Sequence, residues 1–272
     1  MVLSGLSAVL LRPVPSFSDI VQSVRQGTSP PVPEEWKQGR TAYGGLSAGL
    51  LVEVAHKRII DLPQLRSLQV QFTGPVTGDP DLSARLLRQG RNVTSVGAEA
   101  SVEGKPVANA LVIFGAGRES TLDIDDASPR VAAPEACELF MPPGTPFVPA
   151  FIPNFEIRFA GGQRPMAGDP EGRILAWVRH RDPADHDGES AFVCLGDVLP
   201  PAAFAAMRAP VPISSVNWQL NLLREPETRE GWFLVESHQT AAREGYSSQR
   251  MRYWNTEGRL VAEGMQAVAV FG

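Results

Sequence analysis

The chain has few cysteines and no long apolar runs, which argues against a disulfide-stabilised fold and against a membrane-spanning helix. Its two cysteines, Cys137 and Cys194, form neither a metal-ligand spacing nor a disulfide framework, which favours a reducing cytoplasm. No run approaches the roughly 18 apolar residues needed to span a bilayer. The apolar stretch 2–11 has no preceding basic residues, so we interpret it as a terminal extension rather than a signal peptide.

Positive charge and metal-binding patterns are also scarce. The 25 lysines and arginines are outnumbered by 30 aspartates and glutamates, which gives a formal net charge of −5. Nucleic-acid binding needs a basic surface, so nucleic acid is excluded as a main partner. His56 and His238 have no partners at ligand spacing, so we expect no metal site. A phosphate-binding loop of the G-x-x-x-x-G-K-[ST] type is missing as well.

What the chain does contain is an internal duplication. Residues 65–115 hold four runs separated by glycine and proline, and residues 213–272 repeat them loosely. The segment Ser67–Phe72 (S-L-Q-V-Q-F) matches Ser215–Leu220 (S-V-N-W-Q-L), and both copies close on Phe-Gly. Two copies without further repeats indicate a duplicated domain rather than a solenoid.

Each half is predicted to be one buried helix followed by an antiparallel sheet. Apolar residues recur at helical spacing through 46–60 with few charges, which is typical of a helix surrounded by protein. A second helix is predicted over 190–197. Apolar residues alternate with glutamine through 68–72, as in a half-buried antiparallel strand. We therefore predict an α+β fold with two antiparallel sheets, each wrapped around a long buried helix.

The same pattern divides the chain into three parts. Residues 1–118 form the N-terminal half, 119–147 a linker, and 148–272 the C-terminal half with the expected active site. The linker is assigned because it is acidic, rich in proline and without periodicity.

Two motifs suggest other enzyme classes. Residues 45–49 match G-x-S-x-G, the nucleophile elbow of α/β-hydrolases, but that elbow needs a buried strand just before the serine. Residues 37–44 are polar and contain glycine, so we interpret the motif as small residues on a closely packed helix. His186, with acids on both sides, would supply acid–base chemistry in a hydratase, although its proline and charged neighbours are more typical of an exposed loop.

Gln266 is the polar residue that the duplication singles out, because it stands where the first copy has Val112. It shares the strand phase of Val268, which places its amide in an apolar region where it needs hydrogen-bond partners. The nearest candidates by topology are Ser215 and Asp197. An acid, a hydroxyl and an amide that meet at one buried position have two interpretations. They hold and polarise a water molecule, or they form a purely structural hydrogen-bond network.

At these residues the chain resembles the type II acyl-CoA thioesterases, which have a double hot-dog fold. The likeness runs from about Trp36 to the end. In the first half it rests on Tyr43-Gly44-Gly45, Ser67–Phe72, Gly90–Ser95 and Asn109–Phe114. In the second half it rests on Trp177–Arg179, Leu195–Asp197, Ser215–Asn217, Gly258–Ala262 and Gln266.

The resemblance implies hydrolysis of an acyl-CoA thioester to a free acid and CoA. Carried over by position, Asp197 would be the general base or water orienter, with Ser215 and Gln266 fixing the water. Ser214 is the alternative source of the hydroxyl. The family has threonine at this position, and often an Asp-His pair where this chain has Asn217-Trp218. No covalent acyl-enzyme is expected, because no serine or cysteine has a base at recognisable spacing.

The resemblance also implies how the substrate and partners are bound. Tyr43, Gly44 and Gly45 are expected to form a pocket wall or backbone donors, and Arg88 and Arg91 to contact the CoA phosphates. No cofactor is implied beyond the CoA of the substrate, and a homo-oligomer is expected by analogy.

Two further functions stay open beside hydrolysis. One is a non-catalytic acyl-CoA-binding protein, and the other is a hot-dog enoyl-CoA hydratase that depends on His186. Release of free thiol distinguishes the thioesterase from both.

Overall fold

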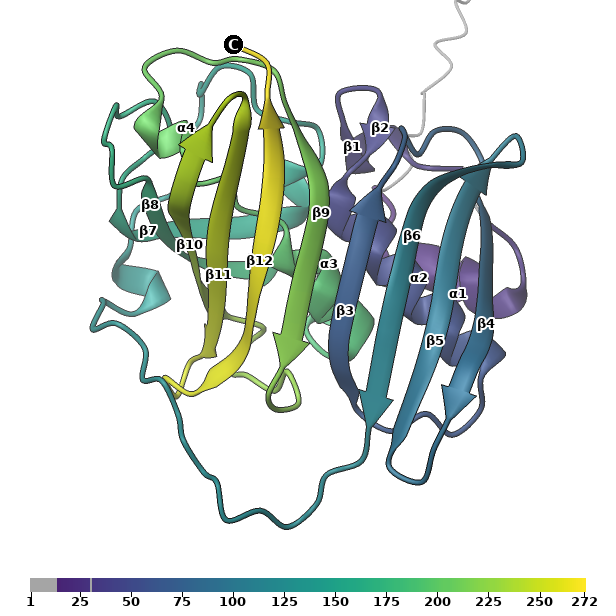
Figure 1. Cartoon of the computed structure of the whole chain (residues 1–272). Helices are drawn as coiled ribbons and strands as arrows, with labels where there is room; N and C mark the ends of the chain where they lie inside the picture. Colours follow the sequence, from purple (N-terminus) through teal and green to yellow (C-terminus); the bar gives the residue numbers. More distant parts are fainter. Residues whose placement is uncertain (1–13, 30) are drawn as a thin grey trace, which may run out of the picture.

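Ten strands form one antiparallel sheet in the order β4-β5-β6-β3-β9-β12-β11-β10-β8-β7 (Figure 1). The computed structural model describes residues 14–29 and 31–272, so the stretch 2–11, interpreted above as a terminal extension, lies outside the described residues. The strands are β3 (Leu65–Phe72), β4 (Asp81–Gln89), β5 (Val93–Val102), β6 (Lys105–Gly115), β7 (Phe155–Gly162), β8 (Arg173–His180), β9 (Ile213–Leu222), β10 (Phe233–Arg243), β11 (Tyr246–Asn255) and β12 (Leu260–Val270). A separate small sheet pairs β1 (Lys37–Gln38) with β2 (Thr41–Ala42).

The helices lie behind the sheet as it is drawn in Figure 1. They are α1 (Phe17–Gln26), α2 (Gly44–Arg58), α3 (Glu189–Gly196) and α4 (Ala203–Ala206), with short 3-10 helices at Glu34–Trp36, Pro134–Ala136, Ile152–Asn154 and Pro183–Asp185. Helix α2 is buried along 45–55 and packs against α1, α3 and strands β4 to β6. Both predicted helices are therefore present, within about two residues of the expected bounds.

The prediction of two sheets around two long helices needs correction on both counts. Strand β3 pairs with β9, with Leu68 opposite Leu220, so the two halves share one continuous sheet. This pairing satisfies backbone groups that separate sheets would leave unpaired at their edges. Helix α3 has 8 residues against 15 for α2, and Pro200 and Pro201 follow it, where a helix cannot continue.

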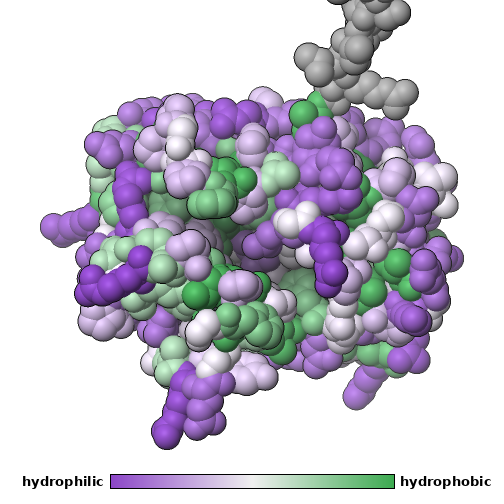
Figure 2. All heavy atoms as spheres, turned by 90° about the horizontal axis from the view of Figure 1, so that it is seen from above, coloured by the Kyte–Doolittle hydropathy of each residue, from purple (hydrophilic) through white to green (hydrophobic). Residues whose placement is uncertain are grey.

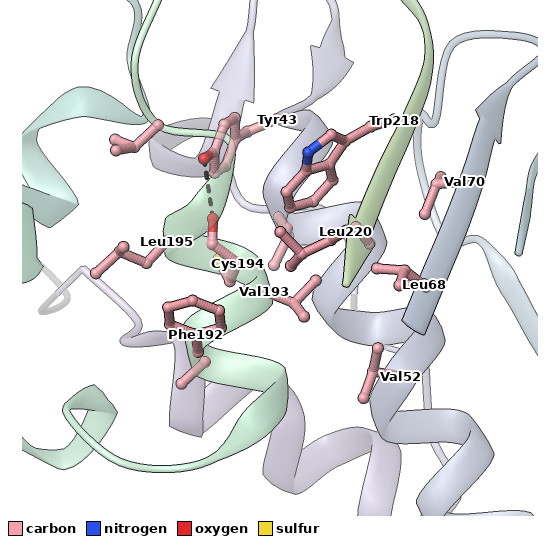
Figure 3. Packing of buried hydrophobic residues seen from close by; sticks show 14 of the residues in the cluster. Tyr43, Val52, Leu68, Val70, Phe192, Val193, Cys194, Leu195, Trp218 and Leu220 are labelled. Atoms are coloured by element: carbon pink, nitrogen blue, oxygen red, sulfur yellow. Dashed lines mark hydrogen bonds between the residues drawn. The ribbon is translucent and has the colours of Figure 1, made fainter. Parts of the chain in front are cut away.

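Apolar side chains from both halves meet between the helices and the central strands. Figure 3 shows Val52 of α2 and Val193 of α3 beside Leu68 of β3 and Leu220 of β9. All four side chains are fully or almost fully buried. The join between the halves is thus part of one hydrophobic core.

The G-x-S-x-G residues form the contact between α2 and α3. A Cβ atom on Gly45 would collide with the carbonyl oxygen of Cys194, and one on Gly49 would lie 2.8 Å from that of Ser190. Ser47 is buried within α2 and its hydroxyl donates to the carbonyl of Tyr43. The serine therefore sits within a packed helix and not on a strand-to-helix elbow.

The segment expected as a linker lies across the second half of the sheet. The indole N–H of Trp254 donates to the carbonyl of Asp126 at 2.7 Å, and that of Trp177 to the carbonyl of Ala132 at 2.9 Å. Val131 and Cys137 pack on a buried cluster that contains both tryptophans. We call residues 125–137 the strap, because hydrogen bonds and apolar contacts hold them against the sheet.

Replacing Gly45 by Ala tests the close approach of α2 and α3. The added methyl group collides with backbone, which cannot move aside cheaply, so we expect a loss of about 1–3 kcal/mol in the free energy of unfolding. The control is Gly97→Ala in β5, where the new Cβ would meet the Leu87 side chain at an ordinary 3.5 Å. Urea unfolding measures both variants, and equal midpoints would contradict the packing argument.

Candidate active site

Asp197, Ser215 and Gln266 are brought together where α3 ends against β9 and β12. The Nε2 of Gln266 donates to Asp197 Oδ1 at 2.7 Å and to Ser215 Oγ at 3.1 Å. Gln266 is 3% exposed, as its strand phase predicted. Both hydrogens of its amide nitrogen are therefore used on protein atoms, which leaves further lone pairs of the Asp197 carboxylate and the hydrogen of the Ser215 hydroxyl to act on a ligand.

A bulge in β9 decides which serine joins this network. Ala267 pairs with Asn217 and Val268 with Ser215, so Val216 is the extra, unpaired residue. Strict alternation would place Ser214 on the same face as Trp218, but the bulge moves Ser215 to that face. Ser214 is exposed, and its hydroxyl reaches only the carbonyl of Ser215 at 3.5 Å.

Asp197 lies at the C-terminal end of α3 and faces the N-terminus of α2. Its Oδ2 is next to Gly44, the first residue of α2, and its carboxylate accepts a hydrogen bond from the backbone of Gly45. Helix α2 has no side-chain cap of its own at Tyr43. The carboxylate thus occupies the position where an anion is stabilised by the unpaired N–H groups of a helix.

Burial dominates the electrostatics of Asp197. It raises the pKa of this carboxyl from 3.8 to about 7, against the hydrogen bonds from Gln266 and Gly45 that act in the opposite direction. The other titratable groups that face Asp197 are Tyr43, Cys194 and Tyr253, and burial raises the pKa of each well above its ordinary value. These three stay protonated near neutral pH, so Asp197 titrates there without them.

A cavity of about 1390 Å³ opens beside these residues, with Gly44, Asp197 and Ser215 on its wall. Most of the remaining wall is apolar and includes Phe72, Phe140, Met141, Phe151, Met166 and Phe204. Figure 2 looks down on the molecule and shows a hollow flanked by apolar residues. A cavity of this kind suits a ligand with a large apolar part.

Of the three residues at the start of α2 that were predicted to bind substrate, only one lines the cavity. Gly44 lines the cavity, whereas Gly45 packs on α3. Tyr43 is buried: its hydroxyl donates to the carbonyl of Cys194 at 2.9 Å (Figure 3), and its ring stacks on that of Phe151. It supports the cavity from behind without lining it.

The predicted CoA-binding arginines lie away from the cavity. Arg88, near the end of β4, and Arg91, in the following turn, are exposed at the end of the sheet opposite to the start of β9 (Figure 1). The arginines on the cavity wall are Arg40 and Arg164. The sequence pattern had not singled these out, because a basic residue in an irregular loop carries no periodicity.

His186 is not brought to the cavity. Its Nε2 lies 3.0 Å from the carbonyl oxygen of His180, in the loop before α3. Among residues 14–29 and 31–272 no cluster of three or more His, Cys, Asp or Glu side chains is arranged to hold a metal ion. In the same ranges, no helix has the length and apolarity required to cross a membrane.

Two family models match the chain. The acyl-CoA thioesterase N-terminal domain matches residues 32–115, and the acyl-CoA thioesterase C-terminal domain matches residues 134–270. The chain belongs to the acyl-CoA thioesterase family. It is thus a member of a family of thioester hydrolases, and its two halves correspond to the two domains of that family.

Solved structures show the same double hot-dog fold. A hot-dog protein of unknown function from Alicyclobacillus acidocaldarius is 24% identical with a TM-score of 0.79, over 89% of this chain and 92% of that one. A putative thioesterase II from Thermobifida fusca is 18% identical with a TM-score of 0.74, over 89% and 91%. An acyl-CoA thioesterase II from Mycobacterium marinum is 19% identical with a TM-score of 0.67, over 84% and 88%. The comparison with curated proteins gives no match.

Replacing Asp197 by Asn should change how stability depends on pH. Between about pH 4 and pH 7 the folded state keeps a proton that the unfolded chain has released, so stability falls as pH rises through this window. Asn carries no such proton, so its stability relative to the wild type should grow across the window by on the order of a few kcal/mol and then level off.

Urea unfolding at several pH values measures this difference. The exposed Asp81→Asn variant, which removes a carboxyl outside the site, is the control. Parallel curves for Asp197→Asn would show that the Asp197 carboxyl has an ordinary pKa.

Proposed function

We propose that this protein hydrolyses acyl-CoA thioesters by adding a water molecule held between Asp197 and Ser215 to the thioester carbonyl. The observation that carries the proposal is the convergence of Asp197, Ser215 and Gln266, with Asp197 and Ser215 on the wall of one large, mostly apolar cavity. Membership of the thioesterase family supplies the reaction class.

We assign the roles from the hydrogen-bonding capacity that the network leaves unused. The Ser215 hydroxyl donates to a lone pair of the water, and Asp197 Oδ2 accepts one of its protons. Gln266 does not contact the water in this arrangement, because both of its N–H groups already hold Asp197 and Ser215. Its part is to fix the two residues that do, which differs from the direct contact expected from the sequence.

The reaction then proceeds by general base catalysis. Asp197 takes a proton from the water as its oxygen adds to the thioester carbon, and a tetrahedral oxyanion forms. The backbone N–H of Gly44 is a candidate donor to this oxyanion, because Gly44 lies on the cavity wall at the start of a helix without a side-chain cap. Collapse breaks the C–S bond, and the departing thiolate of CoA takes the proton from Asp197.

Among the described residues, the serines that line the cavity are Ser47, Ser214 and Ser215, and none of their hydroxyls donates to a base that would activate it as a nucleophile. Ser47 is buried in α2 and donates to its own helix. Cys194 is buried, and burial together with the charges of Asp185 and Asp197 raises the pKa of its thiol. A thiol that stays protonated is a weak nucleophile, so direct attack by water is the better supported route.

The cavity supports an acyl-CoA with a substantial acyl chain as substrate. Its apolar wall suits the chain, and Arg40 and Arg164 provide positive charge for the phosphates of CoA. Arg164 is held in place by its hydrogen bond to the carbonyl of Phe140 and by stacking on Phe159. The contact of Arg88 and Arg91 with CoA, and the homo-oligomer, stay predictions.

Replacing Asp197 by Asn should lower the rate of thiol release by about 100- to 10,000-fold, because the general base is lost. The assay measures free CoA with a thiol reagent over a series of acyl chain lengths. Asp81→Asn should retain the wild-type rate. An unchanged rate in Asp197→Asn would remove this residue from the mechanism, and a wild-type protein that binds acyl-CoA without releasing thiol would favour the non-catalytic alternative.

The pH profile of kcat/KM gives a separate test. Asp197 must be ionised to accept a proton and its pKa is about 7, so activity should rise with pH and reach half of its plateau near pH 7. Rates measured from pH 5 to 9 would show this limb. A flat profile over that range would mean that no group with the raised pKa of Asp197 controls the reaction.

A further inference from the structure

Gln249 lies next to the proposed site and has no role in the reaction described above. It stands on β11 directly opposite Gln266 of β12 and is 1% exposed. Its Oε1 accepts from the backbone N–H of Ala202 at 2.6 Å, and its Nε2 donates to Gln266 Oε1 at 2.6 Å. Both ends of this buried amide are therefore used, and it does not line the cavity.

The two hydrogen bonds of Gln249 fix the orientation of its amide. A glutamine amide can turn by 180° and exchange its oxygen with its nitrogen. The backbone N–H of Ala202 can only donate, so Gln249 must present its oxygen to that group and its nitrogen to Gln266. Gln266 must then present its oxygen to Gln249 and its nitrogen to Asp197 and Ser215.

The reversed orientation of Gln266 would disrupt the site. Its carbonyl oxygen would face Asp197 Oδ1, acceptor against acceptor, and the hydrogen bond that favours the ionised carboxylate would be lost. The Ser215 hydroxyl would also have to donate to that oxygen, and its hydrogen would no longer be free for the water. A reversed amide therefore removes both groups that the proposed reaction uses.

We propose that Gln249 is a positioning residue, which sets the orientation of the Gln266 amide and thereby holds Asp197 and Ser215 ready for the water. The orientation of Gln249 is itself fixed by a backbone group that can only donate, the N–H of Ala202, in the segment that follows Asp197 along the chain. The consequence for activity rests on the proposed function, whereas the consequence for the ionisation of Asp197 does not.

Two substitutions distinguish two roles for Gln249. In one it sets the orientation of the Gln266 amide, and in the other it only accepts the hydrogen bond from Ala202 N–H. Gln249→Leu removes both hydrogen bonds of the side chain. Gln249→Glu keeps an acceptor for Ala202 N–H, and while its carboxyl is protonated it also keeps a donor for Gln266. Once ionised it can only accept, so Gln266 must turn its nitrogen toward residue 249 and its oxygen toward Asp197. Ser247→Ala, a buried position on the same face of β11, is the control.

The first measurement is independent of catalysis. The carboxyl carbon of Asp197 is followed through a pH titration by NMR and assigned by its absence in Asp197→Asn. Its midpoint is expected near pH 7 in the wild type and in Ser247→Ala, and about one to two pH units higher in Gln249→Leu, because the Gln266 amide is then no longer held with its nitrogen toward the ionised carboxylate. An unchanged midpoint in a folded Gln249→Leu would overturn the proposal.

The second measurement is the rate of thiol release. Gln249→Leu should lose about 10- to 100-fold in kcat with little change in KM, since the cavity wall is intact. Gln249→Glu should approach the wild-type rate at low pH and fall below it as pH rises. Wild-type behaviour of Gln249→Glu at every pH would show that the residue only supports Ala202. A wild type without thioesterase activity would refute the proposed function and leave the NMR result to decide the role of Gln249.

Discussion

The close approach of α2 and α3 is the constraint on which the candidate site depends. Gly45 packs on the carbonyl of Cys194, and the hydroxyl of Tyr43 donates to the same carbonyl. This contact brings the end of α3 to the beginning of α2, so that Asp197 faces the unpaired N–H groups of the latter. The small residues of α2 thus place the acid of the site, although they take no part in the chemistry themselves.

The duplication explains why the site occurs in one half only. Strands β3 and β9 are the matching strands of the two copies, and they pair with each other at the centre of the sheet. In the first half β6 carries the buried, apolar Ala110 and Val112, whereas β12 carries the buried Gln266. The first half supplies α2 and part of the cavity wall, and the second supplies the acid, the hydroxyl and the amide.

Much of the site could be predicted from the sequence, because strand phase and the duplication both singled out Gln266. The same argument from strand alternation, applied to β11, would have found Gln249. It lies on the same core-facing side of the strand as Met251 and Tyr253. The choice of Ser215 over Ser214 depends on the bulge at Val216, and a bulge breaks the very alternation on which such predictions rely. Topology and the resemblance to known thioesterases both indicated Ser215, but neither contained the bulge that brings it to the same face as Trp218.

The joining of the halves and the path of the strap could not be predicted in the same way. Both depend on backbone groups: the edges of β3 and β9 pair, and two carbonyls of the strap accept from indole N–H groups. Backbone carbonyls are identical in every residue, so no pattern of side chains reveals which of them will be used. Acidic and proline-rich composition indicated a linker, and such composition says nothing about what the linker covers.

The position of the strap determines where the chain should tolerate an insertion and where it should be sensitive to proteolysis. Residues 116–124 are exposed, so an insertion there would leave the covered surface intact. A proteolytic nick between Asp126 and Ala132 would instead free the segment that shields Trp254 and Trp177. The apolar patch uncovered in this way would favour aggregation of an otherwise folded molecule.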